Sequence, residues 1–207
     1  MVDVIDPDEA VTLLLMGKVV AVPTDTVYGV AASLAHPSGV AALFTLKGRP
    51  SSLALPVLVN SVEQIEAHGV VWPQQARQLA RAFWPGAVTI VVPVPPKIAN
   101  LVGSTSQNAG FRIPNDAPLR SLLSRSGALC VTSANEHGAP PCQSAAQVQG
   151  AFADRDELAG VVDGGERGGR VSTVVELNDH SWRIVREGAI GAAEISAVLG
   201  RAGPHRR

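Results

Sequence analysis

The feature that most constrains the fold is the alternation of short apolar runs with helical segments along the whole chain. Each run has the length of a strand, and turn residues such as Gly, Pro or Asn bound it. The runs lie at residues 18–22, 55–59, 87–92, 109–113 and 128–132. Strands that alternate with helices in this way predict an α/β or α+β domain in which helices cover both faces of a sheet.

Helix signals occupy the intervals between these runs. Asp6 is a good N-cap, Pro7 suits the first helical position, and the acidic first turn complements the helix dipole. We expect helices at residues 6–17, 37–46, 61–67, 73–83, 117–124, 143–152 and 192–199. Prolines 93, 95 and 96 are expected to end the run at 87–92 abruptly.

The last third of the chain has a different pattern. A short apolar run at 161–162 enters a glycine-rich loop at 164–169. Runs at 171–177 and 182–185 flank a polar turn at 178–181, which is typical of a β-hairpin. This antiparallel hairpin argues against an all-parallel sheet, so a mixed sheet is expected.

We see no repeat, low-complexity tract or linker, so residues 1–200 are expected to form one domain, followed by a short tail at 201–207 that frays. Charged residues make up only 17% of the chain, a weak hint of a homodimer face that leaves monomer and homodimer both open. The two cysteines, the absence of a secretory signal and the short apolar runs indicate a cytoplasmic protein with reduced thiols.

Residues 23–30 read PTDTVYGV and directly follow the run at 18–22. Pro23 cannot donate to a sheet ladder and fixes the backbone where the strand ends. The small hydroxyl groups that follow suit ligand binding, because they donate and accept hydrogen bonds without filling the space that a ligand needs. An ordinary strand-to-helix turn has a similar composition, so this segment alone leaves both interpretations open.

Further segments narrow the choice because they occur together and in a fixed order. They read KGRP (47–50), FWPGAVT (83–89), GFRIP (110–114), TSAN (132–135), DGG (163–165), STVV (172–175) and IVREG (184–188). With residues 23–30, this set resembles the signature of the YrdC-type threonylcarbamoyl-AMP synthases. The resemblance extends from about residue 6 to about residue 191.

The resemblance implies a YrdC-like, twisted mixed β-sheet with flanking helices and a concave, positively charged ligand cleft. It implies ATP-dependent synthesis of L-threonylcarbamoyl-AMP from L-threonine, bicarbonate and ATP, with release of pyrophosphate. The product would pass to the threonylcarbamoyl transferase machinery that modifies tRNA. Mg²⁺ would arrive on the ATP phosphates, since no carboxylate cluster points to a dedicated metal site.

The resemblance also assigns roles to particular residues. Lys47 and Arg49 face the nucleotide phosphates as a point charge and a planar fork, and they are the catalytic candidates. The threonine contacts that it implies are Thr26, Arg112, Thr132 and Ser172. The ATP contacts that it implies, besides Lys47 and Arg49, are Asn108, Ser133, Ala134, Asn135, Cys142 and Arg186.

Structural explanations exist for several of these residues. A cation such as Lys47 is favourable at a helix C-terminus on dipole grounds alone. Arg112 lies in an apolar strand, where an arginine is costly unless it pairs with Asp116 or another carboxylate, or holds an anionic ligand. Gly110 would let the backbone lie close to that ligand. Ser133 and Thr132 would serve equally well as helix caps.

The sequence departs from the family pattern at a few positions. The family usually has Lys or Asn, often followed by Pro, where this chain has Leu53 and Ala54. The strand around Leu58, which often ends in a histidine, reads PVLVN at residues 56–60. These changes put the affinity for ATP or the choice of substrate in doubt.

Two alternative functions remain at this stage. One is a carbamoyl-AMP-forming module of the hydrogenase-maturation type, although such modules are usually fused to larger ones. The other is a double-stranded RNA-binding module with possible tRNA contact, which a net charge of −1 disfavours because RNA binding relies on excess positive charge.

Overall fold

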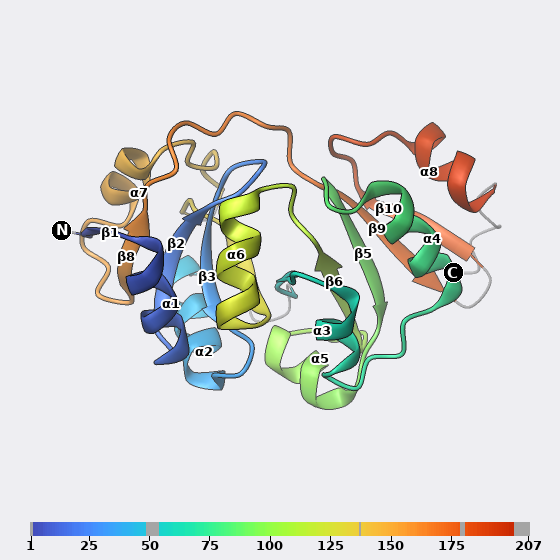
Figure 1. Cartoon of the computed structure of the whole chain (residues 1–207), viewed down its shortest axis with the longest axis horizontal. Helices are drawn as coiled ribbons and strands as arrows, with labels where there is room; N and C mark the ends of the chain where they lie inside the picture. Colours follow the sequence, from blue (N-terminus) through green and yellow to red (C-terminus); the bar gives the residue numbers. More distant parts are fainter. Residues whose placement is uncertain (1, 49–53, 137, 179–180, 201–207) are drawn as a thin grey trace.

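The computed structural model describes residues 2–48, 54–136, 138–178 and 181–200. These residues form a ten-stranded sheet and eight helices (Figure 1). The strands are β1 (Val4–Ile5), β2 (Val19–Pro23), β3 (Tyr28–Ser33), β4 (Val57–Leu58), β5 (Val88–Pro93), β6 (Asn108–Arg112), β7 (Leu129–Ser133), β8 (Leu158–Val162), β9 (Thr173–Asn178) and β10 (Ser181–Arg186).

The helices are α1 (Pro7–Leu15), α2 (Pro37–Lys47), α3 (Val62–Glu66), α4 (Gln74–Phe83), α5 (Pro96–Val102), α6 (Ala117–Ser126), α7 (Ala145–Ala151) and α8 (Ala192–Leu199). The N-terminus of α1 forms as predicted, because the Asp6 carboxylate accepts hydrogen bonds from the backbone N–H groups of Asp8 and Glu9. Among the described residues, no helix is long and apolar enough to span a membrane.

The sheet is mixed, as the late hairpin predicted. Its strand order is β1-β8-β2-β3-β7-β4-β6-β5-β9-β10. The pairs β1–β8, β2–β8, β4–β6 and β5–β9 are parallel, whereas β2–β3, β3–β7, β4–β7, β5–β6 and β9–β10 are antiparallel. The α/β class and the twisted mixed sheet with flanking helices are therefore confirmed.

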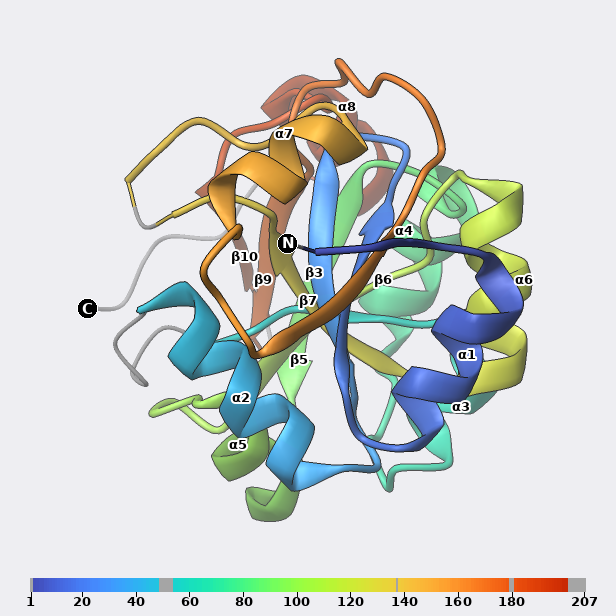
Figure 2. The same cartoon turned by 90° about the vertical axis from the view of Figure 1, so that its left-hand side faces the viewer.

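Both faces of the sheet are covered. Along β2, Val19 and Ala21 belong to one buried apolar cluster, whereas Val20 and Val22 belong to another. Since neighbouring side chains of a strand point to opposite faces, the two clusters lie on the two sides of the sheet. Figure 2 shows α1 and α6 on one side, with α2 and α5 on the other.

The predicted elements agree closely with the structure, apart from the two-residue strand β1, which was not predicted, and two larger omissions. Residues Tyr28–Ser33 form β3, which pairs with β2 through a tight connection, so the segment at 23–30 leads into a hairpin and not into a helix. Residues Pro96–Val102 form α5 directly after the proline cluster that ends β5. Both omissions matter for the site, because β3 and the chain around α5 border the cleft described next.

Candidate active site

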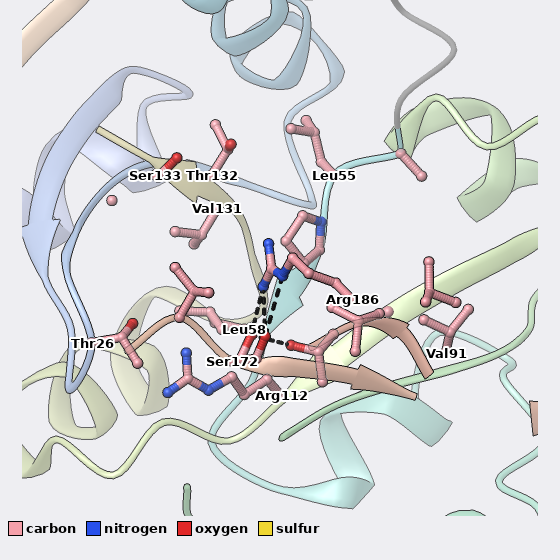
Figure 3. A pocket seen from close by; sticks show the side chains of 18 of the residues that line it. Thr26, Leu55, Leu58, Val91, Arg112, Val131, Thr132, Ser133, Ser172 and Arg186 are labelled. Carbon is pink, nitrogen blue, oxygen red and sulfur yellow. Dashed lines mark hydrogen bonds between the residues drawn. The ribbon is translucent and has the colours of Figure 1, made fainter. Parts of the chain in front are cut away.

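A cleft of about 430 Å³ opens above the shortest internal strand of the sheet. β4 has two residues and joins β7 on one side to β6 on the other. Leu55, Pro56 and Leu58 line the cleft from this region. The predicted residues that line it are Thr26, Asn108, Arg112, Thr132, Ser133, Ser172 and Arg186, most of which appear in Figure 3.

Arg112 ends β6 and is 5% exposed. Its Nη2 donates to the Asp25 carboxylate at 2.6 Å and its Nε donates to the Gly86 carbonyl at 2.8 Å. Burial lowers the pKa of the guanidinium, the Asp25 charge opposes this shift, and nearby Arg186 adds to it. A carboxylate partner for Arg112 is therefore confirmed, but its identity is Asp25 and not Asp116.

Asp116 has other partners. Its carboxylate caps α6 by accepting from the backbone N–H of Leu119 at 2.8 Å, and it lies 3.4 Å from Arg167 Nη2. The sequence suggested Asp116 because it is four positions from Arg112, but Asp116 begins the next helix, where capping fixes its direction.

Gly110 brings two strands close together beside Arg112. A Cβ atom at this position would lie 2.8 Å from Thr89 Cγ2 on β5, which is closer than carbon atoms tolerate. The absence of a side chain also leaves open the part of the cleft that Gly110 lines.

Arg186 ends β10 and projects into the same cleft (Figure 3). Its Nη2 donates to the Ser172 carbonyl at 2.9 Å and to the Ser172 hydroxyl at 3.0 Å, while its Nε donates to the same carbonyl at 3.2 Å. Among the described residues it forms no salt bridge. Partial burial lowers the pKa of this guanidinium. Arg186 therefore supplies a positive charge whose protein partners are neutral oxygens.

Hydroxyl groups surround the two arginines. Ser172 Oγ lies 2.9 Å from Thr89 Oγ1, which places two hydroxyls beside Arg186. Across the cleft, Thr24 Oγ1 lies 2.9 Å from Thr26 Oγ1 and donates to the Val27 carbonyl at 2.7 Å. These contacts hold Thr24 and Thr26 in fixed positions on the cleft wall.

A crossover loop, residues 163–172, runs from β8 to β9 across the top of the view in Figure 1, and its last two residues, Val171 and Ser172, line the cleft. The Tyr28 hydroxyl donates to the Gly165 carbonyl at 2.9 Å and accepts from the Gly164 N–H at 3.0 Å. The Gly169 N–H donates to the Thr26 carbonyl at 2.9 Å. The loop that carries Ser172 is thereby tied to the segment that carries Thr26.

Lys47 lies beneath the cleft wall and does not line the cleft. It is 5% exposed, and its Nζ donates to the Ser133 carbonyl at 2.7 Å, to Asn135 Oδ1 at 2.9 Å and to the Asn135 carbonyl. Asn135 Nδ2 in turn donates to the carbonyls of Glu136 and Ala139 at 2.8 and 2.7 Å. The ammonium group therefore supports the backbone of the loop that presents Thr132 and Ser133.

Ala134 and Cys142 belong to the same support. The Ala134 N–H donates to the Tyr28 carbonyl, and the Ala134 carbonyl accepts from the Cys142 N–H, both at 2.8 Å. Burial raises the pKa of the Cys142 thiol, and Lys47 partly opposes this shift. A thiol with a raised pKa is a poor nucleophile, and neither residue lines the cleft.

Arg49 and Leu53 lie outside the described residues. The other two residues that depart from the family pattern, Ala54 and Leu58, line the cleft. Among the described residues, no group of three or more His, Cys, Asp or Glu side chains is arranged to hold a metal ion. The described side chains that line the cleft include no carboxylate, so they do not fit a protein-held Mg²⁺ site.

Some residues that line the cleft or contact its side chains were not singled out from the sequence. Asp25 and Thr24 lie in the motif segment at 23–30, and Thr89 lies in the segment at 83–89, so the sequence did indicate that they would lie near the site. Ser104 and Ser106 line the cleft after α5, and no pattern marked them.

The fold and the cleft together define a mixed α/β protein with a hydroxyl-lined cleft that contains two arginines. The chain belongs to the Sua5/YciO/YrdC family, whose model, described as telomere recombination, matches residues 12–188. This membership confirms the resemblance drawn from the sequence motifs.

Individual relatives and a solved structure support the same family assignment. A Mycobacterium leprae protein is 38% identical over 207 positions, covering 96% of this chain and 93% of its own length. The Bacillus subtilis threonylcarbamoyl-AMP synthase is 36% identical, covering 93% of this chain and 56% of its own. The crystal structure of Pyrococcus abyssi Sua5 complexed with L-threonine superposes with a TM-score of 0.88 at 32% identity, covering 96% of this chain and 58% of that one.

Proposed function

We propose that this chain synthesises L-threonylcarbamoyl-AMP from L-threonine, bicarbonate and ATP. The observation that carries the proposal is the convergence of Arg112 and Arg186 on one cleft, where among the described residues only Arg112 has a carboxylate partner, Asp25. Two guanidinium groups and one carboxylate leave an excess of positive charge, which favours an anionic ligand. The naming of several relatives as threonylcarbamoyl-AMP synthases supports this choice of reaction.

The threonine end of the cleft is proposed to lie at Arg112. Its guanidinium is already oriented by Asp25 and Gly86, so it would meet the amino-acid carboxylate with little loss of side-chain entropy. Thr26, Thr132 and Ser172 supply hydroxyl groups around this position. The relative solved with L-threonine supports a threonine site in this fold.

The nucleotide end is proposed to involve Arg186, Asn108 and Ser133, which line the same cleft. Arg186 would neutralise part of the phosphate charge. The cluster of Lys47, Asn135, Ala134 and Cys142 would act by holding the Thr132–Ser133 backbone in place, while the role of Arg49 at the phosphates stays a prediction.

The reaction follows from bringing two anions together. The threonine amine combines with bicarbonate to give the carbamate and water, and a carbamate oxygen then attacks the α-phosphorus of ATP. The new O–P bond replaces the bond to the bridging oxygen, and pyrophosphate leaves. Electrostatic neutralisation and positioning would supply the rate without a covalent enzyme intermediate. Mg²⁺ would enter with the triphosphate, since the cleft offers no carboxylate for it.

The product is proposed to pass to a cytoplasmic threonylcarbamoyl transferase that modifies tRNA. Ala54 and Leu58 line an apolar part of the cleft, whereas the family usually has Lys or Asn at the position of Leu53 and often a histidine at the end of the strand around Leu58. If a polar contact to ATP is lost here, the expected consequence is weaker ATP binding and not a different reaction.

The test is pyrophosphate release from ATP by the purified chain, measured with and without threonine and bicarbonate in the presence of Mg²⁺. We expect release only when all substrates are present, together with a threonine-containing adenylate detectable by mass spectrometry. Pyrophosphate release without threonine dependence would contradict the proposal. Salt-dependent binding of double-stranded RNA without any turnover would favour the RNA-binding alternative instead.

A further inference from the structure

A second cavity, of about 470 Å³, lies on the opposite side of β6 from the cleft. Gly110 and Arg112 line the cleft, whereas Phe111 between them contacts Trp72, and Ile113 lines the second cavity. Because side chains alternate across a strand, the two cavities are separated by the sheet. The second cavity is bordered by α3, α4 and α6, and α3 and α6 lie on the near side of the sheet in Figure 1.

One wall of this cavity is aromatic. The rings of Trp72 and Trp84 stack with their centroids 5.5 Å apart and their planes at 27°. Trp84 Nε1 donates to the Val88 carbonyl at 2.7 Å. Trp72 is 4% exposed, and its Nε1 has no hydrogen-bond partner within the described part of the chain. A buried indole N–H without an acceptor is uncommon in native proteins, and here it belongs to a residue of the cavity wall.

The rim of the cavity carries positive charge. Arg77 is paired with Glu66 at 2.6 Å, so its charge is already balanced. Arg81 is exposed, and its side chain forms no hydrogen bond or ion pair with another described residue. Arg120 donates to the neutral Pro114 carbonyl at 3.1 Å and forms no salt bridge with a described residue. Two guanidinium groups therefore border the cavity without a carboxylate partner in the described residues.

We propose that this second cavity binds a nucleoside monophosphate. A planar base suits the half-buried ring of Trp84, since aromatic side chains stack on bases without regard to sequence. Arg81 and Arg120 suit the phosphate, because guanidinium groups bind phosphate through paired hydrogen bonds. Asn60 and Ser61, which line the cavity, carry an amide and a hydroxyl that suit the polar edge of the base or the ribose. The volume falls in the range of small-molecule sites.

The charge balance favours a free mononucleotide over a nucleic acid. Glu63 also lines the cavity, and Glu66 lies beside Arg77. These carboxylates would repel an extended phosphate backbone, whereas a single phosphate can lie between Arg81 and Arg120. Arginines on the outer face of an amphipathic helix are usually only solvated, but here they border a cavity with a tryptophan pair and an unsatisfied donor.

The test separates this cavity from the cleft and does not depend on synthase activity. AMP, adenosine and inorganic phosphate are titrated into the full chain carrying Arg186→Ala, a substitution that weakens ligand binding in the cleft. Calorimetry and tryptophan fluorescence are the readouts. We expect AMP to bind with one equivalent and to quench the fluorescence, while adenosine and phosphate alone bind more weakly. Adding Arg81→Ala and Arg120→Ala should weaken AMP binding at least tenfold, by loss of two charged contacts.

The matched control is Arg155→Ala on the same background, since Arg155 is an exposed arginine far from this cavity in the sequence. It should leave AMP binding unchanged. If the double substitution reduces folding, Arg81→Gln alone provides the same comparison, because the exposed Arg81 side chain is not part of the buried core. AMP affinity that is equal with and without Arg81 and Arg120, or no AMP binding at millimolar concentration, overturns the proposal. Arg81-dependent binding of a single-stranded RNA oligonucleotide that is tighter than that of AMP would replace the mononucleotide by RNA.

Discussion

The carboxylate of Asp25 connects the two walls of the cleft. Its Oδ1 accepts from Arg112 Nη2 at 2.6 Å, and its Oδ2 accepts from the Asn115 N–H at 3.0 Å. Asp25 lies between β2 and β3, whereas Arg112 ends β6 on the other side of β4. The two side chains are 13% and 6% exposed, so water screens their attraction little. The pair therefore orients the guanidinium and also fixes the spacing of the walls.

Asp25→Asn keeps the size of the side chain and removes its charge. We expect the free energy of unfolding to fall by about 3 kcal/mol, because Arg112 is left buried without its counter-charge. The apparent threonine requirement should rise, since the guanidinium is no longer held in one orientation. Urea denaturation and threonine titration of pyrophosphate release measure the two effects. Unchanged stability would contradict a structural role for this pair.

Arg112→Lys tests the other half of the pair. Lysine keeps the charge but loses the planar fork, so we expect a stable protein with a raised threonine requirement and nearly unchanged ATP binding. Arg112→Ala should lose about 3–5 kcal/mol of stability, because the Asp25 carboxylate stays buried. A double-mutant cycle with Asp25→Asn separates the energy of the pair from the effect on threonine. A folded Arg112→Lys protein with wild-type threonine dependence would argue against carboxylate binding by this residue.

Most of the fold could be predicted from periodicity and turn residues, and the omissions have physical causes. Residues 28–33 (YGVAAS) contain few strong β-formers. They form β3 because β2 and β7 pair with them on both sides, a tertiary effect that local propensity does not contain. The prolines before α5 were interpreted as the end of a strand, but Pro96 occupies the first helical turn, where proline is compatible with a helix.

The site was predictable as a set of segments and less so as a set of contacts. The contact between Asp25 and Arg112 joins positions 87 apart, so sequence spacing could not identify it. Lys47 was expected at a helix end facing a ligand, and it does end α2, but it points under the Thr132–Asn135 loop. A periodic pattern gives the boundary of a helix more readily than the depth at which its last side chain is buried.

Lys47→Met is expected to destabilise the protein, in contrast to the mild effect that a surface position would give. The substitution leaves the carbonyls of Ser133 and Asn135 without their charged donor, at a cost of about 1.5–3 kcal/mol. ATP use should fall as well, because Thr132 and Ser133 lose their support. Lys18→Met, at an exposed lysine, is the matched control and should change little. Thermal unfolding that is identical in the two variants would show that the Lys47 contacts add nothing to stability.

The half-buried side chain of His68 makes stability depend on pH. Burial, together with the charge of Lys97, lowers the pKa of its imidazole. The folded state therefore binds fewer protons than the unfolded state near the usual histidine pKa, so stability falls as the pH drops through about 6.5 towards the lowered value. His68→Gln should flatten this part of the stability profile while leaving stability near pH 8 almost unchanged. Denaturation midpoints between pH 5 and pH 8 provide the measurement, and a slope that persists in the variant must come from other groups.

Arg186→Ala is expected to weaken substrate use with little effect on folding. The side chain lies at the end of an edge strand, and its protein contacts are the carbonyl and hydroxyl of Ser172. Loss of a charge-assisted contact to a phosphate should reduce the ratio kcat/KM for ATP by a factor of about 10–100, corresponding to roughly 1.5–3 kcal/mol. Arg183→Ala is the matched control, because Arg183 lies on the same strand but pairs with Glu176. Steady-state pyrophosphate release at varied ATP distinguishes them: equal losses in both variants would mean a general effect of charge, whereas a loss confined to Arg186→Ala would support direct contact with the nucleotide.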